Sequence, residues 1–268
     1  MSFVAATGPH VSLVAEPILR IGPLSITNST ILGGFGLVLL LGMLLWVRYH
    51  ARRQAYDRLT VAILWGYGAL LDTVEDVVGD RAKARQLAPL AISMFFVLII
   101  NNWLGLLPIV GTVSSHGQPL FRGLAADLNF TLALAIITMV VAQLWAIKQV
   151  GFLGHLRTYV VNPLRDPVGA MMGGMEIMAQ FTRLIALAMR LFGNIFAGEV
   201  LLLVIGYLSQ WTAPLSLPMF MGLELFVGAI QAYVFFMLSV VFISLGQSQA
   251  DEENKAPSSL TRAAVAAR

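Results

Sequence analysis

The sequence contains no cysteine and few charged residues. Only 12% of its 268 residues are Asp, Glu, Lys or Arg, whereas soluble domains carry about 25%. The missing thiols exclude a disulfide scaffold, a zinc–cysteine site, an iron–sulfur cluster and a cysteine nucleophile. The scarcity of charge nearly rules out an ordinary cytosolic enzyme, because so few charged side chains cannot cover a soluble fold of this size. It also excludes disorder, since disordered chains are polar and highly charged.

Apolar residues, in contrast, are abundant. They make up 58% of the chain, and the mean hydropathy is +0.80. This composition is typical of a polytopic membrane protein. The net charge of +3 does not by itself indicate an acidic partner. Basic residues collect on the cytoplasmic side of membrane proteins whatever their function.

Five apolar stretches are long enough to cross a bilayer, which requires about 20 residues at about 1.5 Å each. They are residues 31–47, 87–109, 128–147, 168–208 and 217–245. We therefore predict an all-α polytopic membrane protein with five membrane-embedded helices, all within a single membrane domain, residues 1–250.

Lys and Arg are distributed unevenly between the two sides of the membrane. Seven of the 17 lie in 48–86, three in 148–166 and three after residue 250. Only Arg20 and Arg122 lie in segments on the opposite side. Because cytoplasmic loops carry the excess of Lys and Arg, we predict that the N-terminus lies outside and the C-terminus inside.

Three further segments are not predicted to span the membrane. Residues 59–78 are apolar but too charged to span, with three acidic residues on one helical face, so we predict an amphipathic helix at the inner surface. The polar segment 251–268 is predicted to be a flexible tail. Residues 1–30 lack a basic segment followed by an apolar run, so we expect no cleavable signal.

Five charged residues lie inside the last two apolar stretches. They are Glu176, Arg183, Arg190, Glu199 and Glu224. A charge at the centre of a bilayer costs at least about 2.5–3.5 kcal/mol, so such residues face a protein interior or water and are functional candidates. No comparable charges occur in the first three stretches.

The spacing of these residues separates two faces of one helix. Glu176, Arg183 and Arg190 are seven residues apart each time and share one helical stripe, on which Asn194 also lies. Glu199 is nine residues beyond Arg190, a rotation of about 180°, so it faces the other way.

The last apolar stretch returns as the second arm of a hairpin, after a turn that contains Pro214 and Pro218. Glu199 and Glu224 are then each about 10 Å below the outer end of the hairpin. Gln231 lies seven residues past Glu224, on the same face and near the depth of Arg190. Carboxylates exchange protons whereas arginine keeps its proton, so this layout fits a proton path with a fixed-charge barrier.

Structural interpretations of the same residues stay open at this point. Glu176 with Arg183 could form an interfacial ion pair, and Glu199 with Glu224 a structural hydrogen-bonded pair. Polar amides in apolar helices often join helices to one another. Polar residues at the outer loop either cap helix ends or line an aqueous path; they are Asn101, Asn102, Asp127 and Asn129. The four histidines form no ligand set, and we expect no metal or cofactor.

Several segments resemble the a subunit of rotary F-type ATP synthases, called subunit 6 in mitochondria. Residues 189–201, MRLFGNIFAGEVL, resemble its signature, and the similarity continues through 230–238, IQAYVFFML. It is also seen in 102–108, NWLGLLP, and 127–131, DLNFT. With the five-span layout, the resemblance covers about residues 30–250.

The resemblance implies a role for each matching residue. Arg190 corresponds to the arginine that faces the rotor carboxylate, and Glu199 to the carboxylate after the Ala-Gly pair. Glu224 stands where members carry His or Glu. Asn194 and Gln231 match the polar relay residues.

Glu176 and Arg183 match acidic and basic residues upstream in the same helix. The resemblance also implies that the last two helices are long and strongly tilted against the rotor.

The implied function is that of a proton-translocating stator subunit with two offset half-channels. The isolated chain is not expected to be an enzyme. The implied partners are a ring of c subunits, peripheral-stalk b subunits, the F1 sector indirectly and the lipid bilayer, with no nucleic acid. The expected location is the bacterial plasma (inner) membrane or, as an alternative, an organellar energy-transducing membrane. The alternative function is a self-contained secondary transporter or ion channel, although the sequence shows none of the internal repeats usual in such transporters.

Overall fold

The computed structural model of the chain describes residues 17–21, 24–53, 57–107, 110, 114–115, 118–119, 122–150, 167–209 and 211–266. Long helices make up most of this part; they are α1 (Asn28–Arg52), α2 (Arg58–Val78), α3 (Arg81–Gly105), α4 (Leu128–Val150), α6 (Pro167–Ser209) and α7 (Ala213–Ala266). Among the helices described, five are long and apolar enough to cross a membrane, namely all but α2. The predicted all-α polytopic class is confirmed.

Short elements lie between the helices. Two antiparallel hairpins are formed by β1 (Pro17–Ile21) with β2 (Leu24–Thr27), and by β3 (Ser114–Ser115) with β4 (Gln118–Pro119). A short 3-10 helix, η1 (Leu124–Ala126), precedes α4. These hairpins were not predicted.

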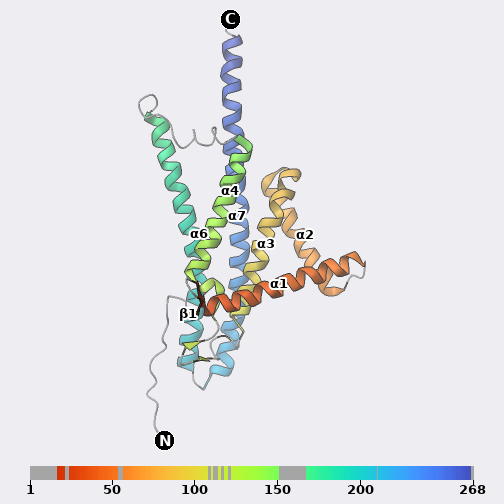
Figure 1. The fold of residues 1–268 in the computed structure, drawn as a ribbon, viewed down its shortest axis with the longest axis vertical. Helices are drawn as coiled ribbons and strands as arrows, with labels where there is room; N and C mark the ends of the chain where they lie inside the picture. The colour runs from red at the N-terminus through yellow and green to blue at the C-terminus, as the bar shows by residue number, and fades with distance from the viewer. Residues whose placement is uncertain are drawn as a thin grey trace.

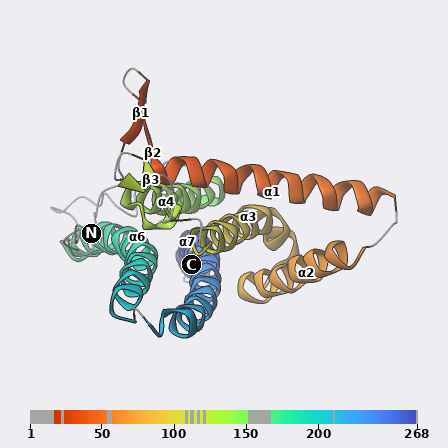
Figure 2. The same ribbon diagram turned by 90° about the horizontal axis from the view of Figure 1, so that it is seen from below.

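The helices fall into two orientations. Figure 1 shows α3, α4, α6 and α7 running roughly side by side, whereas α1 crosses them and extends away from the bundle. In Figure 2 the hairpin of α6 and α7 is seen nearly end-on while α1 lies along the plane of the view. Helices α6 and α7 therefore cross α1 steeply, while their tilt against a rotor stays a prediction.

The turn between α6 and α7 lies earlier than the sequence indicated. The sequence predicts this turn around Pro214 and Pro218, but α7 already begins at Ala213. Pro214 thus occupies the first turn of the helix, where its missing N–H has no intrahelical partner to lose. The backbone carbonyl of Thr212 accepts the first bonds of the new helix, from the N–H groups of Leu215 and Ser216.

Helices α2 and α3 form a hairpin whose turn is fixed by two residues. Gly79 has φ of 73° and ends α2, a backbone conformation that glycine adopts without steric cost. Asp80 then caps α3 by accepting the N–H of Ala82. Helix α3 accordingly starts at Arg81, earlier than the apolar run predicted, and Arg81 contacts Glu75 of α2 at 3.1 Å. The location of α2 at the inner surface stays a prediction.

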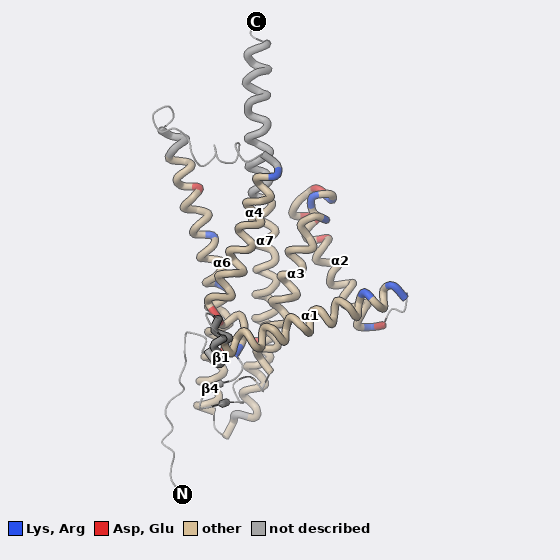
Figure 3. The backbone as a smooth tube through the Cα atoms, in the orientation of Figure 1, with Lys and Arg blue, Asp and Glu red and all other residues tan. Residues whose placement is uncertain are grey.

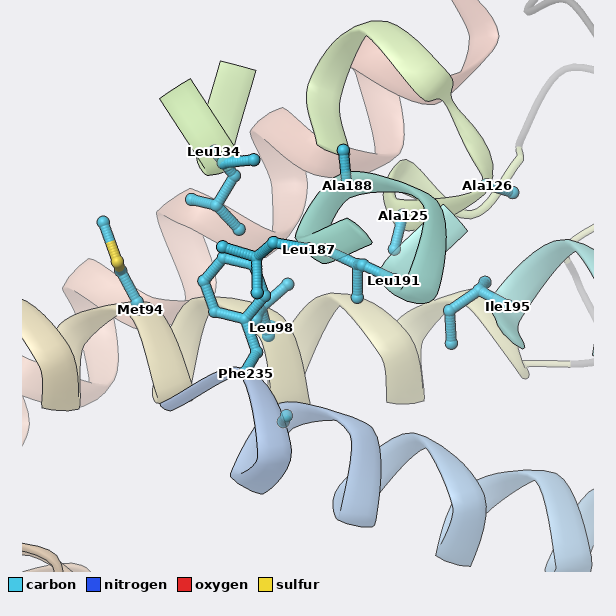
Figure 4. Close-up of a cluster of buried hydrophobic side chains, with 12 residues drawn as sticks. Met94, Leu98, Ala125, Ala126, Leu134, Leu187, Ala188, Leu191, Ile195 and Phe235 are labelled. Atoms are coloured by element: carbon cyan, nitrogen blue, oxygen red, sulfur yellow. The ribbon is translucent and has the colours of Figure 1, made fainter. Parts of the chain in front are cut away.

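The core lies where α3, α4, α6 and α7 meet (Figure 4). Leu191 and Phe235 are fully buried there, and alanines allow the helices to approach closely. The buried cluster consists of Met94, Leu98, Ala125, Ala126, Leu134, Ala135, Leu187, Ala188, Leu191, Ile195, Ala232 and Phe235. A second cluster packs α2 and α3 against α7, with Val74 and Phe236 at its centre. This packing fixes α6 and α7 relative to the loop that precedes α4.

Most of the charged residues that the structure describes lie near the ends of helices. Figure 3 shows them gathered at the α2–α3 turn and at the end of α1, with a few along α6. Side chains are described as far as residue 244 of α7. Beyond that point the structure continues α7 as helix to Ala266, and the flexibility of the tail stays a prediction.

Asp127 joins the start of α4 to the start of α1. Its Oδ1 accepts the N–H of Asn129, which caps α4, and its Oδ2 accepts the hydroxyl of Ser29 at 2.7 Å. Both side chains are buried. Of the two alternatives left open, Asp127 therefore fits the helix-end one.

Replacing Asp127 with alanine is expected to lower the free energy of unfolding by about 1–3 kcal/mol, because a helix cap is lost and the buried Ser29 hydroxyl loses its acceptor. The measurement is the thermal unfolding midpoint of the purified protein in detergent. Asp57→Ala is the matched control, since the exposed Asp57 caps α2 and its side chain has no second contact within the described ranges. Equal effects of the two substitutions would contradict the contribution of Ser29.

Candidate functional site

Helix α6 presents candidate residues on two different faces. Arg190 is exposed on one face of the helix. Glu199 is half-buried on another face and points to the loop before α4. The sequence-derived rotation between the two residues is thus reproduced in the structure.

Glu199 and Glu224 line the same cavity, which we call the carboxylate cavity. It is formed by α3, the loop before α4, α6 and α7, and its volume is ≈ 30 Å³. Its lining residues are Asn101, Asn102, Gly105, Leu106, Gly123, Ala125, Ile195, Glu199, Leu202, Glu224 and Gly228. About 10–15 Å³ is enough for one water molecule, so the cavity has room for water beside both carboxylates.

Glu199 is held by two neighbours in the loop. Its Oε2 lies 3.5 Å from the Nε of Arg122, and its Oε1 accepts the N–H of Gly123 at 3.3 Å. The Arg122 side chain is 10% exposed and that of Glu199 32% exposed. An ion pair this deeply placed is screened much less by solvent than a surface pair.

Glu224 reaches the cavity from α7 and packs against the backbone of α6. It is 7% exposed. A Cβ added at Gly198 would collide with the Glu224 carboxylate, so the carboxylate occupies the space that a side chain would fill. Within the described part of the chain, no cation or hydrogen-bond donor contacts Glu224. The two carboxylates therefore share a cavity but differ in their partners.

Two asparagines of α3 supply further polar atoms to this cavity. The Nδ2 of Asn102 donates to the carbonyl of Gly228 on α7, and the Nδ2 of Asn101 donates to Val97 of its own helix. The Oδ1 atoms of both are buried without a hydrogen-bond partner among the residues that the structure describes. Such acceptors are usually satisfied by water. Asn101 and Asn102 thus fit an aqueous path, whereas Asn129 is exposed outside the cavity.

Asn194 and Gln231 lie together between the last two helices. The Nδ2 of Asn194 donates to the Oε1 of Gln231 at 3.4 Å. Gln231 is buried and Asn194 is half-buried. This contact joins α6 to α7 at one turn from Arg190, as the spacing predicted.

Arg190 lies in an exposed apolar surface. No carboxylate or hydrogen-bond acceptor among the described residues pairs with its guanidinium. Its exposed neighbours on the same helical stripe are Ala186 and Ala197, which offer no polar atom in their side chains. A permanent cation in such a surface is costly in lipid unless another chain supplies an anion.

Glu176 and Arg183 form a separate pair farther along α6. Their side chains approach to 3.8 Å, and Gln180 donates to the same carboxylate. Arg183 also lies 5.8 Å from the ring centroid of Phe242. This geometry fits the ion-pair interpretation, and neither residue lines the carboxylate cavity.

Within the described ranges, no three His, Cys, Asp or Glu side chains gather so as to hold a metal ion.

Sequence reasoning missed the two loop residues that hold Glu199. In the sequence, Arg122 stands out only as one of the two basic residues in segments that are predicted to lie outside. A loop residue follows no helical periodicity, so its contact across 77 residues of sequence has no local signal. Its one distinguishing feature was that a cation is rare on that side of the membrane.

Known proteins with similar sequences identify the family. The model of the ATP synthase A chain family matches residues 31–244. An ATP synthase subunit a from Enterococcus faecalis is 33% identical over 185 residues, which is 65% of this chain and 74% of the relative. The Mycobacterium ulcerans subunit a is 35% identical over 64% of this chain and 66% of the relative. That of Anaeromyxobacter dehalogenans is 36% identical over 63% and 44%. With most of its length matched, the chain belongs to the ATP synthase A chain family.

Proposed function

We propose that this chain is the stator subunit that carries protons to and from the rotor of an ATP synthase, through two offset half-channels. Membership of the family makes it a proton-translocating membrane subunit of the complex. The roles of individual residues are inferred from their burial, contacts and charge.

The exposed position of Arg190 carries the proposal. Its guanidinium has no anionic partner among the described residues, and its exposed neighbours on the same helical stripe are Ala186 and Ala197. Because arginine cannot lose its proton, an anion on a neighbouring chain would lower the free energy of this arrangement. A carboxylate on each subunit of a rotor ring is such an anion. Attraction to Arg190 favours the charged form of that carboxylate and hence release of its proton.

The carboxylate cavity supplies the outer half-channel. Glu199 and Glu224 line a space with room for water, and Asn101 and Asn102 present buried acceptors to it. Asn194 stands between Arg190 and Glu199 along α6, and it donates a hydrogen bond to Gln231 of α7. A proton entering here neutralises a rotor carboxylate, which can then move through lipid.

Because Arg190 and Glu199 lie on different faces of α6, a proton does not pass directly from the outer half-channel to the inner one. Arg190 and Glu199 are on different sides of the helix, and the fixed cation repels a proton that approaches it. A proton therefore travels on the rotor for nearly a full turn before it is released inside. Each charge that crosses 100 mV yields about 2.3 kcal/mol, so several protons are needed for each ATP made.

The proposed partners follow from this arrangement. The exposed face around Arg190 is the surface for a ring of c subunits, and the b subunits of the peripheral stalk connect the chain indirectly to the F1 sector. The bacterial origin of the similar proteins supports a location in the bacterial plasma membrane. Transport by the purified chain alone would instead favour a self-contained transporter or channel.

Arg190→Ala is expected to abolish proton-driven ATP synthesis while the chain still inserts, because the rotor carboxylate loses its fixed counter-charge. The measurement is ATP synthesis by the complex in energised membrane vesicles, with the amount of inserted chain determined in parallel. Arg52→Ala, at the exposed end of α1, is the control. Normal coupled synthesis by the Arg190 variant would defeat the proposal.

Replacing both Glu199 and Glu224 with glutamine is expected to slow proton flux by at least about a hundredfold, the lower range for losing positioned proton-transfer groups. Flux through the membrane sector is followed with a pH-sensitive dye in vesicles. Unchanged flux would show that the two carboxylates have only a structural role.

Gly198→Ala is expected to slow the same flux, since the added methyl group collides with the Glu224 carboxylate and displaces it. Gly174→Ala on the same helix is the control, because a Cβ there meets no atom within 4 Å. Equal flux in the two variants would show that the position of Glu224 does not matter.

A further inference from the structure

The two carboxylates of the cavity have unequal surroundings. Both oxygens of Glu199 face a donor: Arg122 Nε lies 3.5 Å from Oε2, and the Gly123 N–H donates to Oε1. Within the described residues, no such group contacts Glu224, which packs against Gly198. A residue of the outer loop thus distinguishes two side chains that the sequence presents as equivalent.

This difference bears directly on proton binding. A proton added to Glu199 neutralises the carboxylate and so weakens its contacts with both Arg122 and Gly123, because each is stronger to the charged form. A charge-assisted contact is roughly twice as strong as a neutral hydrogen bond, and losing one partner of a buried ion pair leaves the other charge uncompensated. Glu224 can gain or lose a proton without breaking any contact among the described residues.

The loop is built to hold Glu199 in this position. Arg122 is buried and lies directly before Gly123, so one short segment supplies both donors. A Cβ at Gly123 would lie 2.9 Å from Glu199 Oε1, and one at Gly105 would lie 3.3 Å from the Gly123 backbone. The close approach of loop, α3 and carboxylate therefore favours glycine at both positions, because a Cβ at either one would force its neighbour to shift. Helix η1, immediately afterwards, buries Ala125 and Ala126 in the core and anchors the segment.

We propose that Arg122 is a positioning residue that keeps Glu199 as a fixed anion, and that Glu224 is the carboxyl group that carries protons through the cavity. This inference rests on the proposed function, within which it assigns different tasks to the two carboxylates. The fixed anion lowers the free energy of a proton held in the cavity, and the neighbouring Glu224 binds and releases that proton.

The test compares proton flux through the complete ATP synthase in vesicles across a range of outer pH. The variants are R122Q, E199Q, the double variant R122Q/E199Q, and E224Q. R122Q is expected to slow flux by roughly ten- to a hundredfold, as displacement of a reacting group does, and to change the pH profile, because Glu199 becomes free to bind protons. E224Q is expected to slow flux more than E199Q.

The double variant separates positioning from a general effect on folding. If Arg122 acts through Glu199, R122Q adds little loss once E199Q is present, because no unpaired charge remains. R122K, which keeps the positive charge, is expected to retain more flux than R122Q. Losses from R122Q and E199Q that multiply would overturn the inference, as would a pH profile of R122Q that matches the unmodified complex.

An ion pair outside the cavity provides the matched control. Arg85 lies 3.6 Å from Glu75, with its side chain 70% exposed, so R85Q removes a pair of similar length without touching the cavity. Its flux and pH profile are expected to stay unchanged. If R122Q does not assemble, the proton fluxes of E199Q and E224Q still test the proposal. A larger loss of flux from E199Q than from E224Q would contradict the assignment of proton transfer to Glu224. Failure of the proposed function itself is recognised separately, since Arg190→Ala then retains coupled synthesis.

Discussion

The free energy of placing a charge in an apolar medium governs the organisation of this protein. It confines most charged residues to the ends of helices and to connecting segments, as in the pairing of Arg81 with Glu75 at the α2–α3 turn. It also makes each charge inside the last hairpin informative, since a cost of at least about 2.5–3.5 kcal/mol must be offset by a specific neighbour. Glu176 and Glu199 have such neighbours within the chain, in Arg183 and Arg122. Arg190 has no such neighbour among the described residues, so we expect its anionic partner on another subunit.

The packing of the helices places the charged residues of α6 on two different sides. The core of α3, α4, α6 and α7 fixes the rotation of α6, so that Glu199 faces inward to the loop and Arg190 faces outward. A rotation of α6 would bury Arg190 in the core and remove Glu199 from Arg122 together. Small residues also matter where helices approach closely. Gly198 has no side chain, and the Glu224 carboxylate occupies the space that a side chain would fill. The polar path and the exposed cation are therefore consequences of one packed arrangement.

The pattern of the sequence was sufficient for the class of fold, for all five candidate spans and for the faces of α6. Apolar length and helical periodicity are properties of neighbouring residues, so they can be counted along the chain. The interval of nine residues between Arg190 and Glu199 placed them on different faces, and the structure agrees. Helix ends were predicted less well, since caps such as Asp80 and the position of Pro214 shift a boundary beyond the apolar run. The family followed from the 189–201 segment, because that motif combines several residue types at fixed spacing.

Only the tertiary structure decided which of these residues meet. Arg122 lies far from Glu199 in the sequence and on a loop without periodicity, so no local pattern indicates their contact. The roles left open for Asp127 and Asn102 were likewise separated by long-range contacts, with Ser29 for the one and Gly228 for the other. The sequence by itself determined which apolar stretches contain charged residues, because that depends on composition and spacing along the chain. The fold determined which charges are compensated, because compensation depends on distances between segments that only packing brings together.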